Sequence, residues 1–212
     1  MTDCLPLNEI QVRILGCLIE KKATTPDQYP LTLNALKNAC NQKTNRFPVV
    51  NYDAGTVGHE LRTLEGNGTV RMQRGSRVER YQHRLDSVLA IRARDIAVLS
   101  TLMLRGPQTI SEIKARTYAV LGMEDTDAIR EVVERLMNRD SPLVFLVPRQ
   151  PGQKEDRYTH LLAGEPDFSA LPQQRKTLGG RANADLCERV EKLETELTEM
   201  KSQLDLLLQR QD

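Results

Sequence analysis

The side chains best suited to chemistry are the guanidinium groups of five closely spaced arginines. They lie between positions 71 and 84, a segment in which Glu79 is the one acidic residue. They are Arg71, Arg74, Arg77, Arg80 and Arg84. Guanidinium groups make paired hydrogen bonds to phosphate, so this run indicates contact with a polyanion. On a hairpin, about half of them would reach one ligand, because alternate strand positions face opposite ways. A solvated hairpin without a ligand is the alternative.

A second group of polar side chains precedes these arginines. Thr56, His59 and Arg62 are spaced three residues apart, so on a helix they form one exposed edge. Small residues such as Gly55 at its start would allow close approach to base edges. Lys43 and Arg46 come just before this helix, where phosphate contacts are common. The predicted DNA-binding residues are therefore Lys43, Arg46, Thr56, His59, Arg62, Arg74 and Arg77.

Motifs for catalysis are missing from the sequence. It contains no Gly-rich phosphate loop and no Gly-x-Ser-x-Gly elbow. His59, His83 and His160 are far apart, and no Cys or His lies at zinc-ligand spacing from another. We therefore expect neither an enzyme, nor a cofactor, nor a metal site.

An internal repeat shows which elements position these residues. The segment 79–85 (ERYQHRL) returns at 156–162 (DRYTHLL). Two further patterns recur in the same order. Ile14, Leu15 and Leu18 return as Val98, Leu99 and Leu102, and Asp53, Val57, Leu61 and Leu64 return as Asp125, Ile129, Val133 and Leu136. One structural unit is therefore present twice. The repeat makes His83 equivalent to His160. A structural role for both histidines in their hairpins is favoured over a role as paired functional groups.

The first copy of the unit is predicted as three helices and a hairpin. Apolar residues recur at helical spacing from Ile10 to Ile19, after a capping box formed by Asn8 and Gln11. Pro26 predicts the end of this helix, because proline disfavours a helical residue before it. Two more helices are expected after Thr32 and Asp53, an extended segment at 47–50, and strands at 69–73 and 77–83.

The second copy repeats this order. Helices are expected at 93–104, from a capping box at Thr109 and Glu112, and at 125–138, with strands at 143–147 and 157–161. Three helices followed by a hairpin is the order of a winged helix-turn-helix. We predict a mainly α protein with small β-hairpins, an α+β fold of two tandem winged-helix domains at 1–87 and 88–163. A linker at 164–182 and a coiled coil at 183–212 follow.

The C-terminal segment carries a heptad pattern. Its apolar residues alternate in steps of four and three: Leu186, Val190, Leu193, Leu197, Met200, Leu204 and Leu207. Such spacing is typical of the a/d seam of a coiled coil. In a parallel dimer, Arg189 would meet Glu194 and Glu196 would meet Lys201, so both flanking pairs attract. We predict a parallel homodimer, with a single helix folded back onto its own domains as the alternative.

Composition limits the other possibilities. The 212 residues are 39% hydrophobic and 28% charged, with a net charge of +1. No apolar run approaches the roughly 20 residues of a membrane span, and the N-terminal residues do not resemble a signal peptide. A cytoplasmic protein that does not enter the membrane is expected, with reduced thiols at positions 4, 17, 40 and 187. The net charge is +3 for residues 1–87, +1 for 88–163 and −3 for 164–212. Any electrostatic argument must therefore be local.

A long motif resembles a known family. It comprises residues 20–36 (EKKATTPDQYPLTLNAL) and 39–46 (ACNQKTNR), accompanied by 76–78 (SRV), Tyr81, 83–84 (HR) and 104–109 (LRGPQT). These segments closely resemble the signature of the YceH-like family of bacterial proteins. The resemblance covers nearly the whole chain and implies a tandem winged-helix fold. It implies no activity and no site residues. From the residues themselves, Asn41, Gln42 and Asn45 suit loop bracing, and a ligand site of Asn41, Lys43 and Arg46 is the alternative.

Two functions remain as hypotheses. The first is a dimeric, transcription-regulator type of protein whose N-terminal domain reads double-stranded DNA. The third helix of the second domain has an acidic first turn that would repel phosphate, so that domain would pack against the first or receive a protein partner. Its charged residues are Glu124, Asp125, Asp127, Glu131 and Glu134 against Arg130, Arg135 and Arg139. The second is a protein-interaction scaffold resembling the tandem winged-helix accessory subunits of bacterial condensin complexes.

Overall fold

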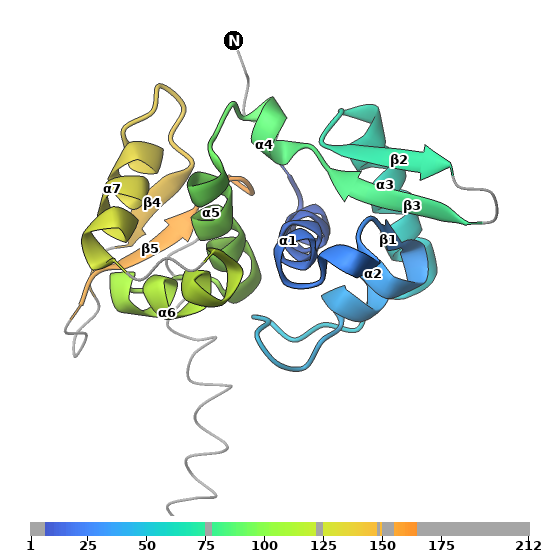
Figure 1. Ribbon diagram of the computed structural model, residues 1–212, viewed down its shortest axis with the longest axis horizontal. Helices are drawn as coiled ribbons and strands as arrows, with labels where there is room; N and C mark the ends of the chain where they lie inside the picture. The colour runs from blue at the N-terminus through green and yellow to red at the C-terminus, as the bar shows by residue number, and fades with distance from the viewer. Residues whose placement is uncertain (1–6, 75–77, 122–124, 148, 150–154, 165–212) are drawn as a thin grey trace, which may run out of the picture. The chain divides into compact units, whose positions relative to one another are not determined.

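The computed structural model describes residues 7–74, 78–121, 125–147, 149 and 155–164, all within one compact unit, Met1–Pro166. Its helices are α1 (Glu9–Thr24), the 3-10 helix η1 (Pro26–Gln28), α2 (Leu33–Cys40), α3 (Ala54–Gly66), α4 (Leu85–Val88), α5 (Ala93–Arg105), α6 (Ile110–Leu121) and α7 (Thr126–Met137). Its strands are β1 (Leu31–Thr32), β2 (Val70–Arg74), β3 (Glu79–His83), β4 (Val144–Val147) and β5 (Arg157–His160). Figure 1 shows their arrangement. The predicted coiled-coil seam at 186–207 lies outside the described residues.

The strands form two small antiparallel sheets, in the orders β1-β3-β2 and β4-β5. Helices combined with such sheets confirm the α+β class. Strand β1 and helix α4 were not predicted, because elements of two and four residues are too short to show a periodic pattern. Residues 47–50, predicted to be extended, belong to no strand. None of the described helices has both the length and the apolarity needed to cross a membrane.

The two halves of the unit repeat each other in their helix caps. Asp53 caps α3 and Asp125 caps α7, and each carboxylate accepts a backbone N–H from the first turn. The Thr32 hydroxyl accepts a backbone N–H at the start of α2, and Thr109 does the same for α6. These residues fill matching positions of the repeat, so the duplication extends to individual hydrogen bonds.

A second repeated contact fixes the last strand of each half. In the first half, Arg80 Nη1 donates to the Pro30 carbonyl at 2.9 Å. In the second half, Arg157 Nη1 donates to the Pro107 carbonyl at 3.1 Å. Each arginine therefore ties its strand to the segment before the second helix, which gives at least one guanidinium of the hairpin a structural use.

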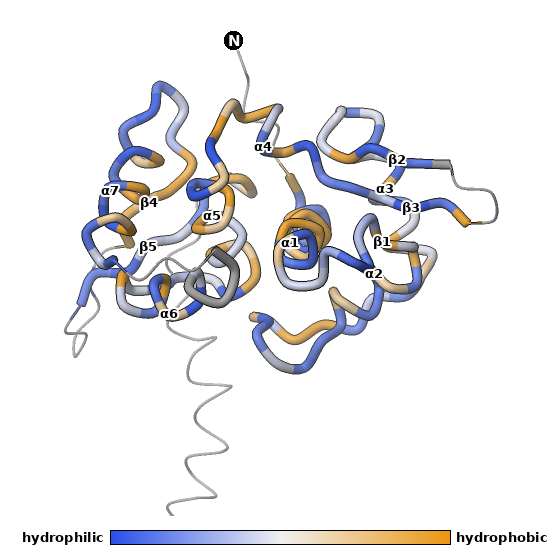
Figure 2. The backbone as a smooth tube through the Cα atoms, viewed as in Figure 1, coloured by the Kyte–Doolittle hydropathy of each residue, from blue (hydrophilic) through white to orange (hydrophobic). Residues whose placement is uncertain are grey.

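Helices α1 and α5 pack against each other and join the halves. Residues 11–20 of α1 and 95–104 of α5 are buried without interruption, and both helices carry hydrophobic residues over much of their length (Figure 2). A helix with one partner buries only one face. Each helix therefore packs against its own half on one side and against the other helix on the opposite side. Gly16 marks the closest approach, because a Cβ there would lie 2.9 Å from Leu104 Cδ2 and 3.0 Å from Leu104 Cγ.

Replacing Gly16 with valine is expected to lower the free energy of unfolding by about 1–3 kcal/mol, the usual cost of overpacking a core. The added atoms would push against Leu104 and Met103 of α5. Urea unfolding at equilibrium measures the effect. Gly66→Val is the control, because no atom lies within 4 Å of a Cβ at that position. Equal losses in both variants would attribute the cost to helix propensity and contradict a tight α1–α5 contact.

Candidate nucleic-acid interface

Helix α3 presents a polar edge to solvent. Its inward face is buried and consists of Val57, Leu61 and Leu64. The Asp53 carboxylate sets the start of the helix by accepting the Thr56 N–H at 2.9 Å. The Thr56 hydroxyl also donates to the Asp53 carboxylate at 2.7 Å, and Thr56 is half-buried. His59, Arg62 and Thr63 are exposed. Two of the three predicted groove-facing residues, His59 and Arg62, therefore reach solvent freely.

The β2–β3 register sorts the side chains of the hairpin onto two faces. Arg71 lies opposite Gln82, and Gln73 lies opposite Arg80, so these four residues share the outer face. Arg71, Arg80 and the following Arg84 are exposed. Within the described part of the chain, no carboxylate forms an ion pair with any of these three arginines. The outer face is therefore polar and cationic.

The edge of α3 borders this hairpin. Tyr81, on the inner face of β3, donates its hydroxyl to Glu79 Oε2 at 3.0 Å. Burial and the carboxylates of Glu79 and Glu65 raise the pKa of Tyr81 to about 12, and the Arg62 guanidinium opposes that shift. Helix α3 also packs directly against β2. A polyanion at Arg62 would therefore also meet the hairpin, with two carboxylates close by.

The two basic residues predicted before α3 differ in exposure. Lys43 is exposed, whereas the side chain of Arg46 is 0% exposed. The prediction of Arg46 as a phosphate contact is therefore wrong. Of the remaining predicted contacts, Arg74 ends β2, and Arg77 lies outside the described residues.

Arg46 is buried because every N–H of its guanidinium has a partner. Nη1 and Nη2 donate to the two oxygens of Glu20, at 3.2 and 2.6 Å. Nε donates to the Ala39 carbonyl at 3.0 Å, and the other two N–H groups donate to the Asn45 carbonyl and to Gln42 Oε1, both at 2.8 Å. All five donors of the side chain are thus used. Its partner lies 26 residues away, so residue spacing could not predict the pair.

The polar residues of the long motif also brace the fold. Asn41 Nδ2 donates to the Tyr52 carbonyl at 2.8 Å, and its Oδ1 accepts the Tyr52 N–H at 2.8 Å. Asn45 Oδ1 accepts from Arg116 Nη1 of the second half at 3.2 Å. These contacts favour structural bracing over a ligand site at Asn41, Lys43 and Arg46.

The repeat-equivalent histidines are enclosed by protein. His83 is 5% exposed, and neither of its ring nitrogens has a hydrogen-bond partner among the described residues. Burial lowers its pKa to about 4, helped by Lys22 and opposed by Asp86. Burial also lowers the pKa of His160 to about 4, and its Nδ1 is buried without a partner in the described part of the chain. Neutral imidazoles in such surroundings favour the structural interpretation.

Other candidate chemistry is sparse in the described residues. Cys17 and Cys40 are buried free thiols, and Cys17 lies in the core as predicted. The described side chains include no group of three His, Cys, Asp or Glu residues placed to hold a metal ion.

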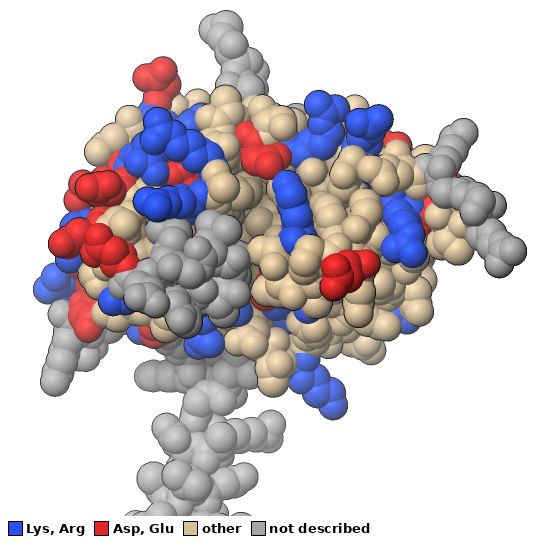
Figure 3. Space-filling view, in the orientation of Figure 1, with Lys and Arg blue, Asp and Glu red and all other residues tan. Residues whose placement is uncertain are grey.

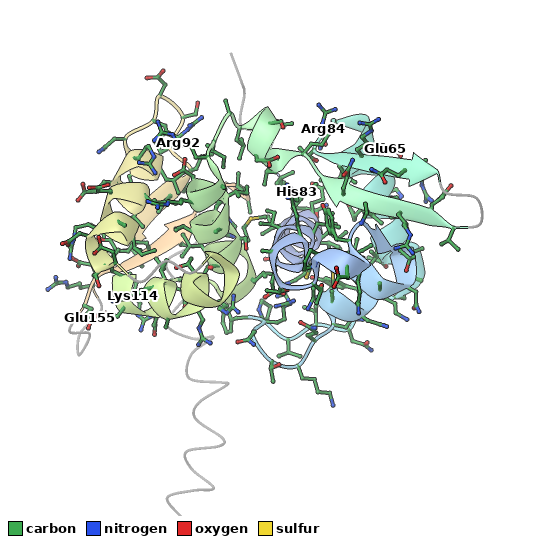
Figure 4. All side chains as sticks on the ribbon, viewed as in Figure 1. Glu65, His83, Arg84, Arg92, Lys114 and Glu155 are labelled. Atoms are coloured by element: carbon green, nitrogen blue, oxygen red, sulfur yellow. The ribbon has the colours of Figure 1, made fainter. Side chains whose placement is uncertain are left out.

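A second group of arginines, missed from the sequence, lies where α5 begins and α7 ends. Its members are Arg92, Arg94, Arg135 and Arg139, and we call it the α5 arginine cluster. Figure 3 shows basic side chains gathered over the upper ends of these helices beside acidic ones, and Figure 4 labels Arg92 there. Arg135 lies in the last turn of α7 and Arg139 just beyond its end, so helical spacing did not mark them as a pair. The contacts of Arg135 with Asp95 and of Arg139 with Leu89, 40 and 50 residues away, could not be predicted from residue spacing.

Comparison with other proteins places the chain among close relatives. Residues 7–153 match the model of a family described as "Protein of unknown function, DUF480". The UPF0502 protein Smlt0097 of Stenotrophomonas maltophilia (strain K279a) is 47% identical over 202 residues, covering 93% of this chain and 92% of the relative. The UPF0502 protein xcc-b100_4348 of Xanthomonas campestris pv. campestris (strain B100) is 48% identical over 220 residues, covering 100% and 98%. A UPF0502 protein of Pseudomonas syringae pv. tomato is 45% identical over 206 residues, covering 95% and 92%.

Proposed function

This chain belongs to the DUF480 family, and we propose that it binds double-stranded DNA through the first of two winged-helix domains. In this proposal α3 enters the major groove and the β2–β3 hairpin contacts the neighbouring backbone. His59 and Arg62 face the bases, and Lys43, Arg71 and Arg84 contact phosphates. Dimerisation through the heptad at 186–207 would bring two such surfaces together, as in a regulator of transcription.

The proposal is carried by one observation, the exposure of the α3 edge and the outer hairpin face. The second half packs on α1 through α5, yet His59, Arg62, Arg71 and Arg84 all remain exposed. Exposed guanidinium groups without carboxylate partners bind phosphate by releasing counterions. An exposed edge of the third helix and exposed arginines on the hairpin are the two features that a DNA-reading winged helix uses.

Replacing Arg71 and Arg84 together with alanine is expected to weaken DNA binding and its salt dependence. If each arginine contacts one phosphate, the slope of log K against log salt falls by about 2. The affinity would fall on the order of tenfold for each contact at 0.1 M salt. Fluorescence anisotropy of a labelled duplex at several salt concentrations measures both quantities.

Arg130→Ala with Arg149→Ala is the control for lost charge, since it removes two exposed arginines from the second half, one of which is paired with Asp156. Its salt slope should equal that of the wild type. Absence of wild-type binding at low salt would refute the proposal, as would equal slopes for the two double variants.

One observation favours a protein-interaction scaffold as the second candidate. Phe145 and Leu146 of β4 are 39% and 38% exposed, so each face of the β4–β5 sheet presents one large apolar side chain. Affinity purification from cell extract separates the two functions. A stoichiometric protein partner that survives nuclease treatment, with no binding to duplex DNA, would support the scaffold.

A further inference from the structure

The α5 arginine cluster has charge that the fold does not neutralise. Asp95 is buried at 3% exposure and is already used. Its Oδ2 accepts the backbone N–H of Arg92 at 3.0 Å, and its Oδ1 accepts from Nε of Arg135 at 3.2 Å and from Nη2. Arg94 is exposed, and no ion pair joins Arg92 or Arg94 to a carboxylate in the described part of the chain. Asp95 therefore offsets Arg135 and leaves the other charges at the surface.

Arg139 is held in place without losing its charge. Its Nη2 donates to the Leu89 carbonyl at 2.8 Å, just before α5. A carbonyl positions a guanidinium but does not cancel it. The first turn of α5 adds the positive end of the helix dipole at the same place, which Asp95 offsets in part. The cluster is thus a fixed cationic surface built from two elements.

The repeated framework does not require these arginines. In the first half, α1 takes the place of α5, and its capping box uses Asn8 and Gln11 where the second half has Arg92 and Asp95. The first turn of α1 carries Glu9. One framework thus folds with a neutral-to-acidic helix start in one half and a strongly basic start in the other. The basic start therefore calls for an explanation beyond folding.

The cluster continues the surface proposed for DNA. Arg84 and Arg92 are separated by the single turn of α4, and Figure 4 labels them on the two sides of that turn. The acidic residue between them, Asp86, lies 3.5 Å from Lys22 Nζ, so its charge is offset. A backbone that follows the hairpin past Arg84 would reach Arg92 next. This continuity favours one long polyanion over a separate acidic peptide.

We propose that the α5 arginine cluster binds the phosphate backbone of the same duplex that the first half reads. The second half then extends the DNA footprint without reading sequence, because phosphate contacts position a protein but carry no base information. This inference rests on the proposed function. It reverses the expectation that the acidic residues of α7 keep the second half away from DNA, although acidic side chains lie beside the cluster.

The test compares Arg92→Ala/Arg94→Ala with the wild type on two duplexes. One has about 10 base pairs, near one helical turn, and the other about 30. On the longer duplex the salt slope should fall by about 2 and the affinity on the order of tenfold per lost contact at 0.1 M salt. On the shorter duplex both values should equal those of the wild type, because the first half alone covers it.

The Arg130→Ala/Arg149→Ala variant again serves as the charge-matched control, with wild-type values expected on both duplexes. Unchanged circular dichroism and thermal midpoint show that each variant is folded. If Arg71→Ala/Arg84→Ala weakens binding but Arg92→Ala/Arg94→Ala does not, the cluster proposal fails and the proposed function stands. If the wild type binds neither duplex, both fail. Binding of polyglutamate that depends on Arg92 and Arg94, with DNA binding unchanged, would assign the cluster to an acidic protein and overturn the inference.

Discussion

Replacing Glu20 with alanine is expected to lower the free energy of unfolding by about 3–5 kcal/mol, the usual cost of breaking one side of a buried ion pair. Glu20 is the counter-ion of Arg46, whose side chain is 0% exposed, and it also lies 3.7 Å from Arg105 Nη2. Its loss leaves a buried guanidinium without compensation. Because globular domains are stable by only about 5–15 kcal/mol, the change should be visible in a simple urea titration.

A double-mutant cycle separates the ion pair from other effects. Arg46→Met alone leaves Glu20 without its main partner, whereas Glu20→Ala with Arg46→Met removes both charges. The double variant should therefore lose less stability than the sum of the single variants. Glu9→Ala, an exposed acidic residue of the same helix, should change the unfolding free energy by about 0.5 kcal/mol or less. A loss below about 1 kcal/mol for Glu20→Ala would show that Arg46 does not depend on this carboxylate.

The ion pair also gives a physical account of the long motif. Glu20 begins its first segment and Arg46 ends its second. Between them, Asn41 braces the loop before α3, and Asn45 reaches Arg116 of the second half. The motif is therefore the part of the chain that closes the first half on itself and connects it to the second. Pro30 of the same motif also accepts a hydrogen bond from Arg80 of β3, which is a further contact of a structural kind.

Local features of the fold could be predicted from the sequence. Asn8 with Gln11 and Thr109 with Glu112 form the expected capping boxes. Gly68, which has a φ of 77°, follows the end of α3 at Gly66, as glycine commonly does after a helix. Each of these signals depends on residues within a few positions of one another, where spacing alone fixes which groups can meet.

Long-range features could not be predicted in the same way. The expected apolar stripe of α1 includes Ile14 and Leu18, but the face around Gly16 is also buried, because α5 packs against it. A hydrophobic pattern shows which face prefers the core and does not show that a second partner covers the rest. For the candidate site, helical spacing was sufficient to predict that His59 and Arg62 are exposed. The burial of Arg46 depends on the carboxylate of Glu20 in another helix, and residue spacing does not predict that contact.

Lowering the pH from 6.5 to 4 is expected to destabilise the protein through His83 and His160. Burial holds the pKa of each near 4 in the folded chain, whereas an unfolded histidine has a pKa of about 6.5. Between these values the unfolded chain binds more protons, so stability is greatest above pH 6.5 and falls as the pH decreases toward 4. The difference corresponds to at most about 3 kcal/mol for each histidine.

Replacing His83 with phenylalanine removes its share of this loss and keeps an aromatic ring near Tyr29, whose ring centre is 6.5 Å away. Carboxylates titrate in wild type and variant alike, so the difference between their unfolding free energies at pH 7 and pH 4.5 isolates the histidine. The loss between those two pH values should be smaller in His83→Phe and smallest when His160 is also replaced. Gln82→Ala controls for disturbance of β3, since it changes the same strand without removing a titrating group. Parallel pH profiles for all variants would mean that both imidazoles gain protons as easily in the folded protein as in the unfolded chain, and their burial would then have no energetic consequence.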